Sequence, residues 1–268
     1  MNNEYKKIIE TANFIKEKAD INPKIAMILG SGTGAFTDNI EDSIEFKYEE
    51  IPNFPVSTVN GHEGKLVLGT VKGKKVIAMK GRFHYYEGYD MKEVTFPIRV
   101  FKMLGVEKLI IVTASGAVNK DLNTGDLVII NDYIKLTALS PLRGENIEEF
   151  GPRFPNMNTG FDNELLKEIF KENDIEPKEG VFAFMAGPQY ETRSEVNMLR
   201  MLGADVVAMS TVPEIIVGKH MSLDVNVICC VTNSVNDAAH LSHEEVVKVA
   251  NANKDKLKNV LLSYIERM

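Results

Sequence analysis

Short apolar runs alternate with segments of helical periodicity along most of this 268-residue chain. Ile25–Leu29 is a continuous apolar run closed by glycines, which is typical of a strand buried on both faces. Residues 93–104 and 213–221 show helical spacing instead, and strand candidates lie between such segments. This alternation predicts an α/β fold, with one domain over residues 1–268 and a mostly parallel or mixed central sheet.

Three other segments carry clear local signals. Residues 65–80 predict a hairpin that turns near Gly73. Residues 137–160 hold three prolines and little periodicity, so we expect a long loop, and loops of this length are usually functional. Ser242 has capping-box spacing to the acid three residues later, which predicts one long final helix ending near Ile265.

Charge and hydropathy exclude two classes of partner. The chain has 31 Lys and Arg against 38 Asp and Glu, a net charge of −7, which argues against a nucleic-acid binder that needs a basic face. The longest apolar run, Val181–Ala186, is far shorter than the roughly 20 residues of a membrane-spanning helix. The charged N-terminus does not resemble a signal peptide, and the adjacent Cys229 and Cys230 predict reduced core thiols, so we expect a cytoplasmic protein.

Small, polar or charged side chains follow six of the predicted strands, including those expected over Lys108–Thr113 and Asn226–Val231. In α/β proteins, ligands bind beyond the carboxyl ends of strands. The six segments are GSGTG at 30–34, GRFHYYEG at 81–88, ASG at 114–116, AGPQYET at 186–192, MST at 209–211 and TN at 232–233. One such strand end would carry little weight, but six together predict a single shared pocket.

Four side chains in these segments suit a small oxyanion. The glycine loop presents backbone N–H groups beside the Ser31 hydroxyl. The planar guanidinium of Arg82 matches two phosphate oxygens, His84 shares its face in an extended segment, and Ser210 adds a hydroxyl. No Lys-Ser or Lys-Thr follows the glycines, which argues against a P-loop nucleotide triphosphatase. A plain tight turn and a surface ion pair remain alternatives for the loop and for Arg82 taken singly.

Three further residues suit a flat ligand with a polar edge. Glu191 supplies a hydrogen-bond acceptor, Asn233 supplies both a donor and an acceptor, and Tyr190 supplies a ring that can cover one face. Together they could hold a heterocycle. The alternatives are an acid that stabilises a helix N-terminus for Glu191 and a turn residue for Asn233.

Three other chemistries have weak support. Residues 30–35 fit the dinucleotide pattern G-x-G-x-x-A, but residues 36–43 leave too little chain for the crossover helix that this pattern requires. The five histidines form no H-E-x-x-H or Cys-His array, so no metal site is predicted. The G-x-S-x-G pattern is absent, which argues against a serine hydrolase.

These residues resemble the trimeric, low-molecular-mass purine nucleoside phosphorylases of the nucleoside phosphorylase-I family. The likeness extends from about residue 24 to the C-terminus and rests on five motifs in the family's order. They are GSGTG at 30–34, GRFHYYEGY at 81–89, AGPQYET at 186–192, MSTVPE at 209–214 and TN at 232–233. The resemblance implies one phosphorylase domain, a mixed sheet distorted into a barrel and surrounded by helices, a homotrimer, and phosphate as co-substrate with no cofactor.

The resemblance also implies three groups of contacts and gives no metal a role. Phosphate would meet Ser31, Arg82, His84, the backbone N–H of Ala114, and Ser210; ribose would meet Tyr86, Met209 and His243; the base would meet Tyr190, Glu191 and Asn233. Catalysis would rest on Asn233, Glu191 and His84. Phe154 would reach the active site of a neighbouring subunit, and His62 resembles a histidine near the phosphate.

Hydrogen-bonding patterns predict which base is preferred. A 6-oxopurine offers an acceptor at position 6 and a donor at N1, which match a donating Asn233 amide and an ionised Glu191. Adenosine offers an amino group and no N1 proton, so it matches neither residue. We therefore expect reversible phosphorolysis of inosine, guanosine and their deoxy forms to free base and (deoxy)ribose 1-phosphate, as in purine salvage.

Some positions depart from the mammalian pattern, and two rival functions stay open. Tyr190 replaces a Phe, Ser234 a Lys and Thr113 an Asn, which leaves fine specificity undecided. The related methylthioadenosine phosphorylases carry Asp where Asn233 stands and lack the acid at Glu191. A nucleoside-binding protein without catalysis would bind inosine and release no hypoxanthine.

Overall fold

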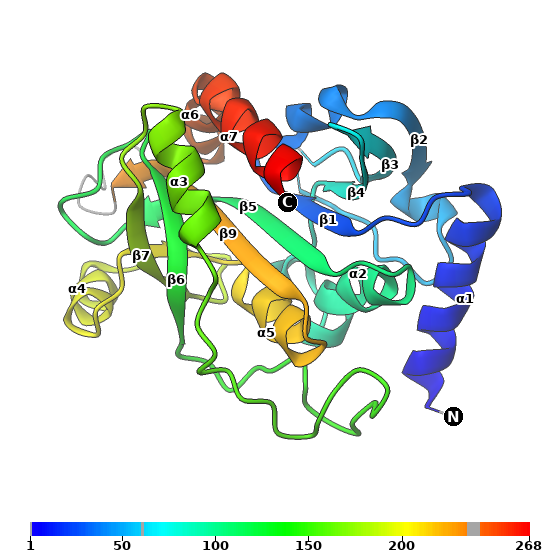
Figure 1. Ribbon diagram of the computed structural model, residues 1–268. Helices are drawn as coiled ribbons and strands as arrows, with labels where there is room; N and C mark the ends of the chain where they lie inside the picture. Colours follow the sequence, from blue (N-terminus) through cyan, green and yellow to red (C-terminus); the bar gives the residue numbers. More distant parts are fainter. Residues whose placement is uncertain (1, 60–61, 235–241) are drawn as a thin grey trace.

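The computed structural model describes residues 2–59, 62–234 and 242–268, and its nine described strands form one mixed sheet (Figure 1). The strands are β1 (Ile25–Leu29), β2 (Glu41–Lys47), β3 (Lys65–Val71), β4 (Lys74–Lys80), β5 (Lys108–Ala117), β6 (Leu127–Lys135), β7 (Lys178–Phe184), β8 (Val206–Ala208) and β9 (Asp224–Ser234). The helices are α1 (Asn3–Lys18), α2 (Met91–Met103), α3 (Glu164–Glu172), α4 (Arg193–Met201), α5 (Val212–His220), α6 (His243–Ala252) and α7 (Lys254–Arg267). Short 3₁₀ helices are η1 (Gly34–Asn39), η2 (Tyr48–Glu50) and η3 (Tyr85–Glu87).

The strand order closes part of the sheet into a barrel. The order is β2-β3-β4-β1-β5-β8-β7-β6-β9, and β9 also pairs with β5. This last pairing makes a closed ring of β5, β8, β7, β6 and β9. The strands β1 to β4 extend from β5 and form the open part of the sheet. Parallel pairs such as β1 with β5 and antiparallel pairs such as β6 with β9 coexist. The expectation of a mixed sheet distorted into a barrel and surrounded by helices is confirmed.

Strand β1 shows why its residues form a continuous apolar run. Ala26 and Ile28 pack into the core that includes side chains of α1, α2 and α5, whereas Met27 and Leu29 pack into the core that includes side chains of α3 and α7. Figure 1 shows α7 on one side of the central strands and α2 and α5 on the other. Because successive strand side chains point to opposite faces, a strand covered on both faces must be apolar at every position.

Several local predictions are confirmed. The hairpin of residues 65–80 is β3 and β4, and Lys72 and Gly73 at its turn have positive φ values of 49° and 75°, as a two-residue turn between twisted strands requires. The predicted loop is also present, since residues 136–163 contain no helix or strand. No helix among the described residues is long and apolar enough to cross a membrane.

The predicted single final helix is wrong. Two helices, α6 and α7, meet at Asn253, whose backbone has left the helical conformation at φ −98° and ψ 5°. The side-chain amide of Asn253 donates to the carbonyl of Val249 at 3.0 Å and so satisfies the end of α6. The bend lets Leu257 and Val260 of α7 enter the core, where both are at least 96% buried.

Two strand ends also lie further along the chain than predicted. β5 continues past Thr113 to Ala117 and β9 continues past Val231 to Ser234, because these polar extensions pair with each other. Their register shifts between Ser115 and Gly116, and such irregularities re-aim side chains at the rims of barrels. Strand β2 was not predicted, since its side chains are exposed except for Phe46.

Candidate active site

All six of the predicted strand-end segments contribute to the wall of one cavity of about 340 Å³. The lining residues are Ser31, Val59, Tyr86, Ala114, Ser115, Gly116, Pro188, Tyr190, Glu191, Val207, Ala208, Met209, Ser210, Thr232, Asn233, His243 and Val246. Parts of the chain more than 200 residues apart in sequence therefore meet here, because the ring of strands brings their ends together.

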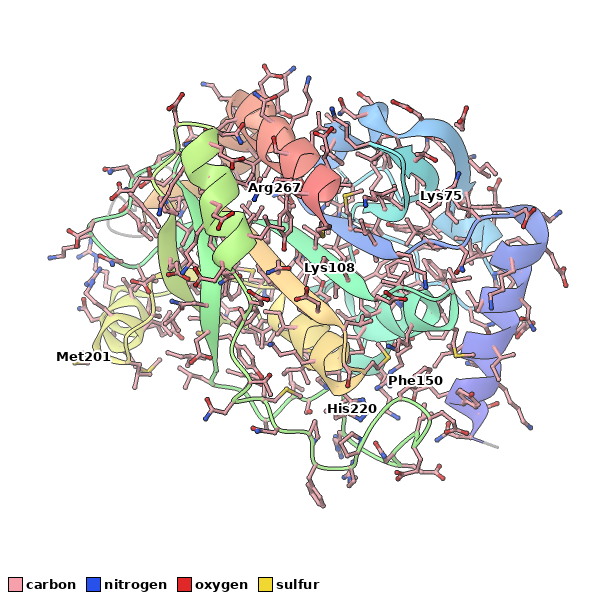
Figure 2. All side chains as sticks on the ribbon, viewed as in Figure 1. Lys75, Lys108, Phe150, Met201, His220 and Arg267 are labelled. Carbon is pink, nitrogen blue, oxygen red and sulfur yellow. The ribbon has the colours of Figure 1, made fainter. Side chains whose placement is uncertain are left out.

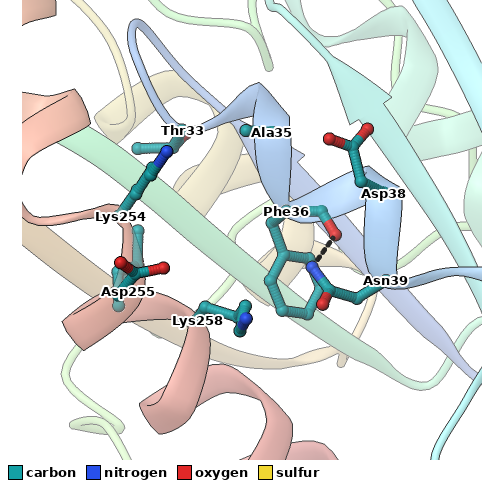
Figure 3. A pocket seen from close by; sticks show the side chains of 9 residues that line it. Thr33, Ala35, Phe36, Asp38, Asn39, Lys254, Asp255 and Lys258 are labelled. Atoms are coloured by element: carbon teal, nitrogen blue, oxygen red, sulfur yellow. Dashed lines mark hydrogen bonds between the residues drawn. The ribbon is translucent and has the colours of Figure 1, made fainter.

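A second cavity lies beside the glycine loop and differs in the residues that line it. It has a volume of about 200 Å³ and lies between η1 and the start of α7 (Figure 3). Lys254 and Lys258 line it, but so do Asp38 and Asp255, and only Thr33 comes from the glycine loop. Because it draws on one strand end and its charges offset one another, we assign the chemistry to the larger cavity.

The guanidinium of Arg82 lies behind one end of the larger cavity. Its Nη1 donates to the hydroxyls of Ser210 at 2.9 Å and Thr211 at 2.7 Å, and its Nη2 donates to the carbonyl of Val112 at 3.1 Å. The carboxylate of Glu214 lies 3.7 Å from Nη1. Arg82 is 1% exposed, so this positive charge is held in a low-dielectric setting where it interacts strongly with anions.

Ser31 and His62 form a second polar pair at this end. The Ser31 Oγ lies 3.2 Å from Nε2 of His62, and Nδ1 of the same ring lies 3.0 Å from the carbonyl of Arg82. If Nδ1–H donates to that carbonyl, Nε2 is left as an acceptor for the serine hydroxyl. Burial, and then the nearby His84, lower the pKa of His62 to about 4, so this ring is neutral near pH 7.

His84 is oriented by a carboxylate three residues later. Its Nδ1 lies 2.9 Å from Oε1 of Glu87, and the same oxygen accepts from the His84 backbone N–H at 2.8 Å. The ring of His84 also stacks on Tyr86, with 4.7 Å between the ring centroids. Burial lowers the pKa of His84 despite the hydrogen bond to Glu87. Burial alone would raise the pKa of Glu87, but hydrogen bonds from His84 and Thr58 outweigh it and lower that pKa.

Glu191 and Asn233 line the same cavity from two different elements. The Thr232 hydroxyl donates to Oδ1 of Asn233 at 3.1 Å, so this oxygen has a hydrogen-bond donor. The N–H groups of the same amide can then serve as donors to a ligand. Burial, and then the charge of Glu195, raise the pKa of Glu191 despite a backbone hydrogen bond. The Tyr190 ring is 41% exposed at the mouth of the cavity.

The structure places most, but not all, of the predicted site residues in the cavity wall. Ser31, Ala114, Ser210, Tyr86, Met209, His243, Tyr190, Glu191 and Asn233 line it. Arg82 and His84 do not; they are buried just behind it, where Arg82 contacts Ser210 and His84 stacks on Tyr86. Phe154 lies outside the wall and is 87% exposed. Thr113 is buried and lies 3.4 Å from the Ser210 hydroxyl, and Ser234 ends β9.

Three residues that support the buried cation and His84 were not predicted from the sequence. Thr211 and Glu214 contact Arg82, and Glu87 contacts His84. The only signal for Glu87 was an acid three residues after a histidine. Glu214 was visible as part of the MSTVPE motif, but nothing in the sequence paired it with a residue 132 positions earlier. Within the described ranges, no group of three or more His, Cys, Asp or Glu side chains is placed to hold a metal.

The chain matches known proteins over nearly its whole length. The family model of the phosphorylase superfamily matches residues 24–266. Purine nucleoside phosphorylase 1 of Bacillus subtilis is 49% identical over 248 residues, which cover 91% of this chain and 92% of that protein.

Solved structures give the same result. Isoform 2 of purine nucleoside phosphorylase from Schistosoma mansoni, in complex with cytosine and ribose-1-phosphate, has 42% identity and a TM-score of 0.94, covering 98% of this chain and 97% of that one. Two structures of a Schistosoma mansoni purine nucleoside phosphorylase are 37% identical to this chain and match 98% of it. The complex with inosine has a TM-score of 0.92 and is covered to 96% of its length. The complex with adenosine has a TM-score of 0.93 and is covered to 97%. The chain belongs to the phosphorylase superfamily and, within it, to the purine nucleoside phosphorylases of the low-molecular-mass type, enzymes that split purine nucleosides with phosphate.

Proposed function

We propose that the chain catalyses the reversible phosphorolysis of 6-oxopurine nucleosides, inosine and guanosine and their deoxy forms, in purine salvage. The observation that carries this proposal is the composition of one cavity wall, in which Ser31 and Ser210 stand together with Glu191 and Asn233. The first pair suits a phosphate and the second suits the polar edge of a purine. Tyr86, Met209 and His243 line the space that a ribose would take.

Phosphate binding would use the buried charge and the hydroxyls around it. The Ser31 and Ser210 hydroxyls and the Ala114 backbone would contact the phosphate, and Arg82 would reinforce them from behind Ser210. The neutral His84, oriented by Glu87, keeps Nε2 as an acceptor for a phosphate hydroxyl. A buried guanidinium stabilises an anion far more than an exposed one does.

The reaction would proceed through positioning and electrostatics. A phosphate oxygen forms a bond to C1′ of the ribose while the C1′–N9 bond breaks, and the electron pair leaves with the purine. The phosphate anion also stabilises the positive charge that develops on the ribose. The Asn233 amide would hydrogen-bond the base as negative charge builds on it, and the Glu191 carboxylate would accept a hydrogen bond from N1–H of the purine.

Base preference follows from the same two side chains. An ionised Glu191 accepts a hydrogen bond from N1–H of a 6-oxopurine but faces a lone pair in adenosine, and the Asn233 amide can donate to O6. Discrimination by a buried, hydrogen-bonding site against a mismatched analogue is large because polar groups are left unpaired. Since a relative crystallised with adenosine, turnover rather than binding is the property to measure.

The exposed Phe154 supports a homotrimer in which each active site is completed by its neighbour. An aromatic side chain that is 87% exposed on a long loop outside its own cavity gains most by packing against a partner. Sedimentation velocity of the purified chain tests the assembly; a monomer that retains full activity would contradict it.

Ultraviolet monitoring of inosine with and without phosphate tests the reaction itself. We expect hypoxanthine to form only with phosphate, and adenosine to be split at least about 100-fold more slowly at saturating phosphate, as a mismatched hydrogen bond implies. Equal rates for the two nucleosides would refute the preference while leaving phosphorolysis intact. Methylthioadenosine serves as the third substrate, because rapid cleavage of it would favour the rival family.

A further inference from the structure

The last two residues of α5 hold the long loop at two points. The Nζ of Lys219 donates to the carbonyl of Gly160, and Nε2 of His220 lies 3.1 Å from the carbonyl of Pro152. We call Lys219 and His220 the clamp. The segment between the two contacts carries Phe154, which is 87% exposed. An exposed aromatic ring therefore lies on a segment that is held at both ends.

The His220 side of the clamp is tightly packed. His220 is 2% exposed, and a Cβ added to Gly151 would come within 2.1 Å of the His220 carbonyl oxygen, so only glycine fits there. The preceding Phe150 is 5% exposed and packs edge-on against Tyr5 at 5.6 Å, with Arg99 5.5 Å from its ring centroid. Figure 2 shows Phe150 and His220 close together at the end of α5.

The Lys219 side has two interactions of its own. Besides the hydrogen bond to Gly160, the ammonium lies 4.2 Å from the centroid of the Phe161 ring, within the range of a cation–π contact. Arg153, inside the segment, makes two further contacts. Its Nη1 donates to the carbonyl of Leu142 at 3.0 Å, and its guanidinium lies 5.8 Å from the centroid of the Phe154 ring.

The clamp is attached to a rigid element. Residues 212–218 of α5 are buried, and Thr211, the N-cap residue that precedes the helix, accepts a hydrogen bond from Arg82 behind the active-site cavity. The helix thus runs from the active site of its own chain to the loop that carries Phe154. A mobile segment loses conformational entropy when it docks, whereas a segment already held in its docked conformation loses much less.

We propose that Lys219 and His220 are positioning residues that hold residues 152–160 so that Phe154 is presented to the active site of a neighbouring copy of this chain. The inference rests on the proposed function in that it requires the homotrimer and the role of Phe154. It adds that the loop is prepared in each subunit before assembly and that the clamp acts on the neighbour's site, not on its own.

The first test compares the double variant Lys219→Met/His220→Ala with Phe154→Ala. We expect both to raise the KM for inosine by about three- to tenfold, the effect of one aromatic contact, with little change in the KM for phosphate. Lys219→Arg/His220→Gln keeps donors at both positions and should restore the KM, and Lys171→Met at an exposed position of α3 is the matched control. Adding Phe154→Ala to the clamp variant should produce no further rise, because both changes remove one interaction.

The second test uses mixed trimers purified through two affinity tags. Clamp-variant subunits, whose own cavities are intact, are assembled with Asn233→Ala subunits, which have an intact clamp and a disabled cavity. If the clamp acts on the neighbour's site, clamp-variant cavities beside intact clamps recover the wild-type KM for inosine. An unchanged, raised KM in the mixed trimers would overturn the inference.

The outcomes separate this inference from the proposed function. An inactive wild-type chain would refute the function. An active wild-type trimer whose clamp variants show unaltered KM values would refute the clamp alone. Should the double variant fail to fold, as judged by circular dichroism, Lys219→Met alone removes one contact of the clamp at a partly exposed position and must raise the inosine KM in the same direction; a wild-type KM would count against the clamp.

Discussion

The Nη1 atom of Arg82 lies 2.9 Å from the hydroxyl oxygen of Ser210, although 128 residues separate the two in sequence. Both residues were expected to meet phosphate, but the structure gives them different positions. Ser210 lines the cavity and Arg82 stands behind it, where it donates to the serine oxygen and leaves the serine O–H free to turn toward an anion. The buried charge therefore acts partly through Ser210.

Replacing Arg82 by Lys should weaken phosphate use more than nucleoside use. A lysine keeps the charge but cannot donate at once to Ser210, Thr211 and the Val112 carbonyl, which Arg82 does with a planar fork. We expect kcat/KM for phosphate to fall by about 10²- to 10³-fold, the usual cost of losing one oriented donor. Steady-state kinetics at saturating inosine check this, and an unaltered phosphate KM would contradict the assignment.

Asn233→Asp should shift the base preference toward 6-amino purines. An ionised aspartate can only accept hydrogen bonds, so it loses the donor proposed for O6 and gains an acceptor for an amino group. We expect the ratio of adenosine to inosine kcat/KM to rise by at least about tenfold. Asn233→Ala is the matched control, since it removes the donor and adds no acceptor; an equal ratio in both variants would argue against direct contact with the base.

Glu191→Gln should remove part of the decrease in kcat/KM for inosine that the wild-type enzyme shows at acid pH. Burial, with the charge of Glu195, raises the pKa of the Glu191 carboxyl, so its protonation begins at a higher pH than for an ordinary glutamate. We expect wild-type kcat/KM for inosine to fall on the acid side, and the ratio of wild-type to variant activity to fall with it. Taking the ratio at each pH cancels the ionisation of phosphate, and a pH-independent ratio would exclude Glu191 as a cause of this decrease.

His62 should make the folded state sensitive to acid. Its pKa falls from 6.5 in the unfolded chain to about 4 in the folded one, so the unfolded chain binds more protons between these values. The free energy of unfolding is therefore unaffected above pH 6.5 and decreases as pH falls from 6.5 to 4, by at most about 1.4 kcal/mol per pH unit. Urea unfolding of His62→Gln should show a shallower decrease. A parallel decrease would mean that other groups, such as His84, dominate.

The local elements of the fold were within reach of the sequence. The apolar run of β1, the turn at Gly73 and the cap at Ser242 each depend on residues within a few positions of one another, and the structure contains all three. The prediction of one final helix failed because it depended on tertiary packing. The turn at Asn253 depends on whether the next helix gains more by packing than by continuing, which periodicity alone does not report.

For the candidate site, too, some features could be predicted from the sequence and others depended on tertiary contacts. The composition of the six strand ends indicated a pocket for an oxyanion and a heterocycle, because hydrogen-bonding capacity is a property of residue type. Which residue contacts which was decided by barrel closure: the pairing of β5 with β9 brings Ala114 and Asn233 into one wall. No sequence signal paired Arg82 with its partners Thr211 and Glu214, since their distance from it depends on how α5 packs.

By itself, then, the sequence determined the chemical types of the groups, the alternation of strands and helices, and the family likeness. Only the tertiary structure decided that Arg82 supports Ser210 from behind, that His62 contacts Ser31, and that α5 joins the cavity to the loop carrying Phe154. The physical reason is that the chemistry of a side chain is set by its own atoms, whereas its partners and burial are set by contacts between segments far apart in the chain.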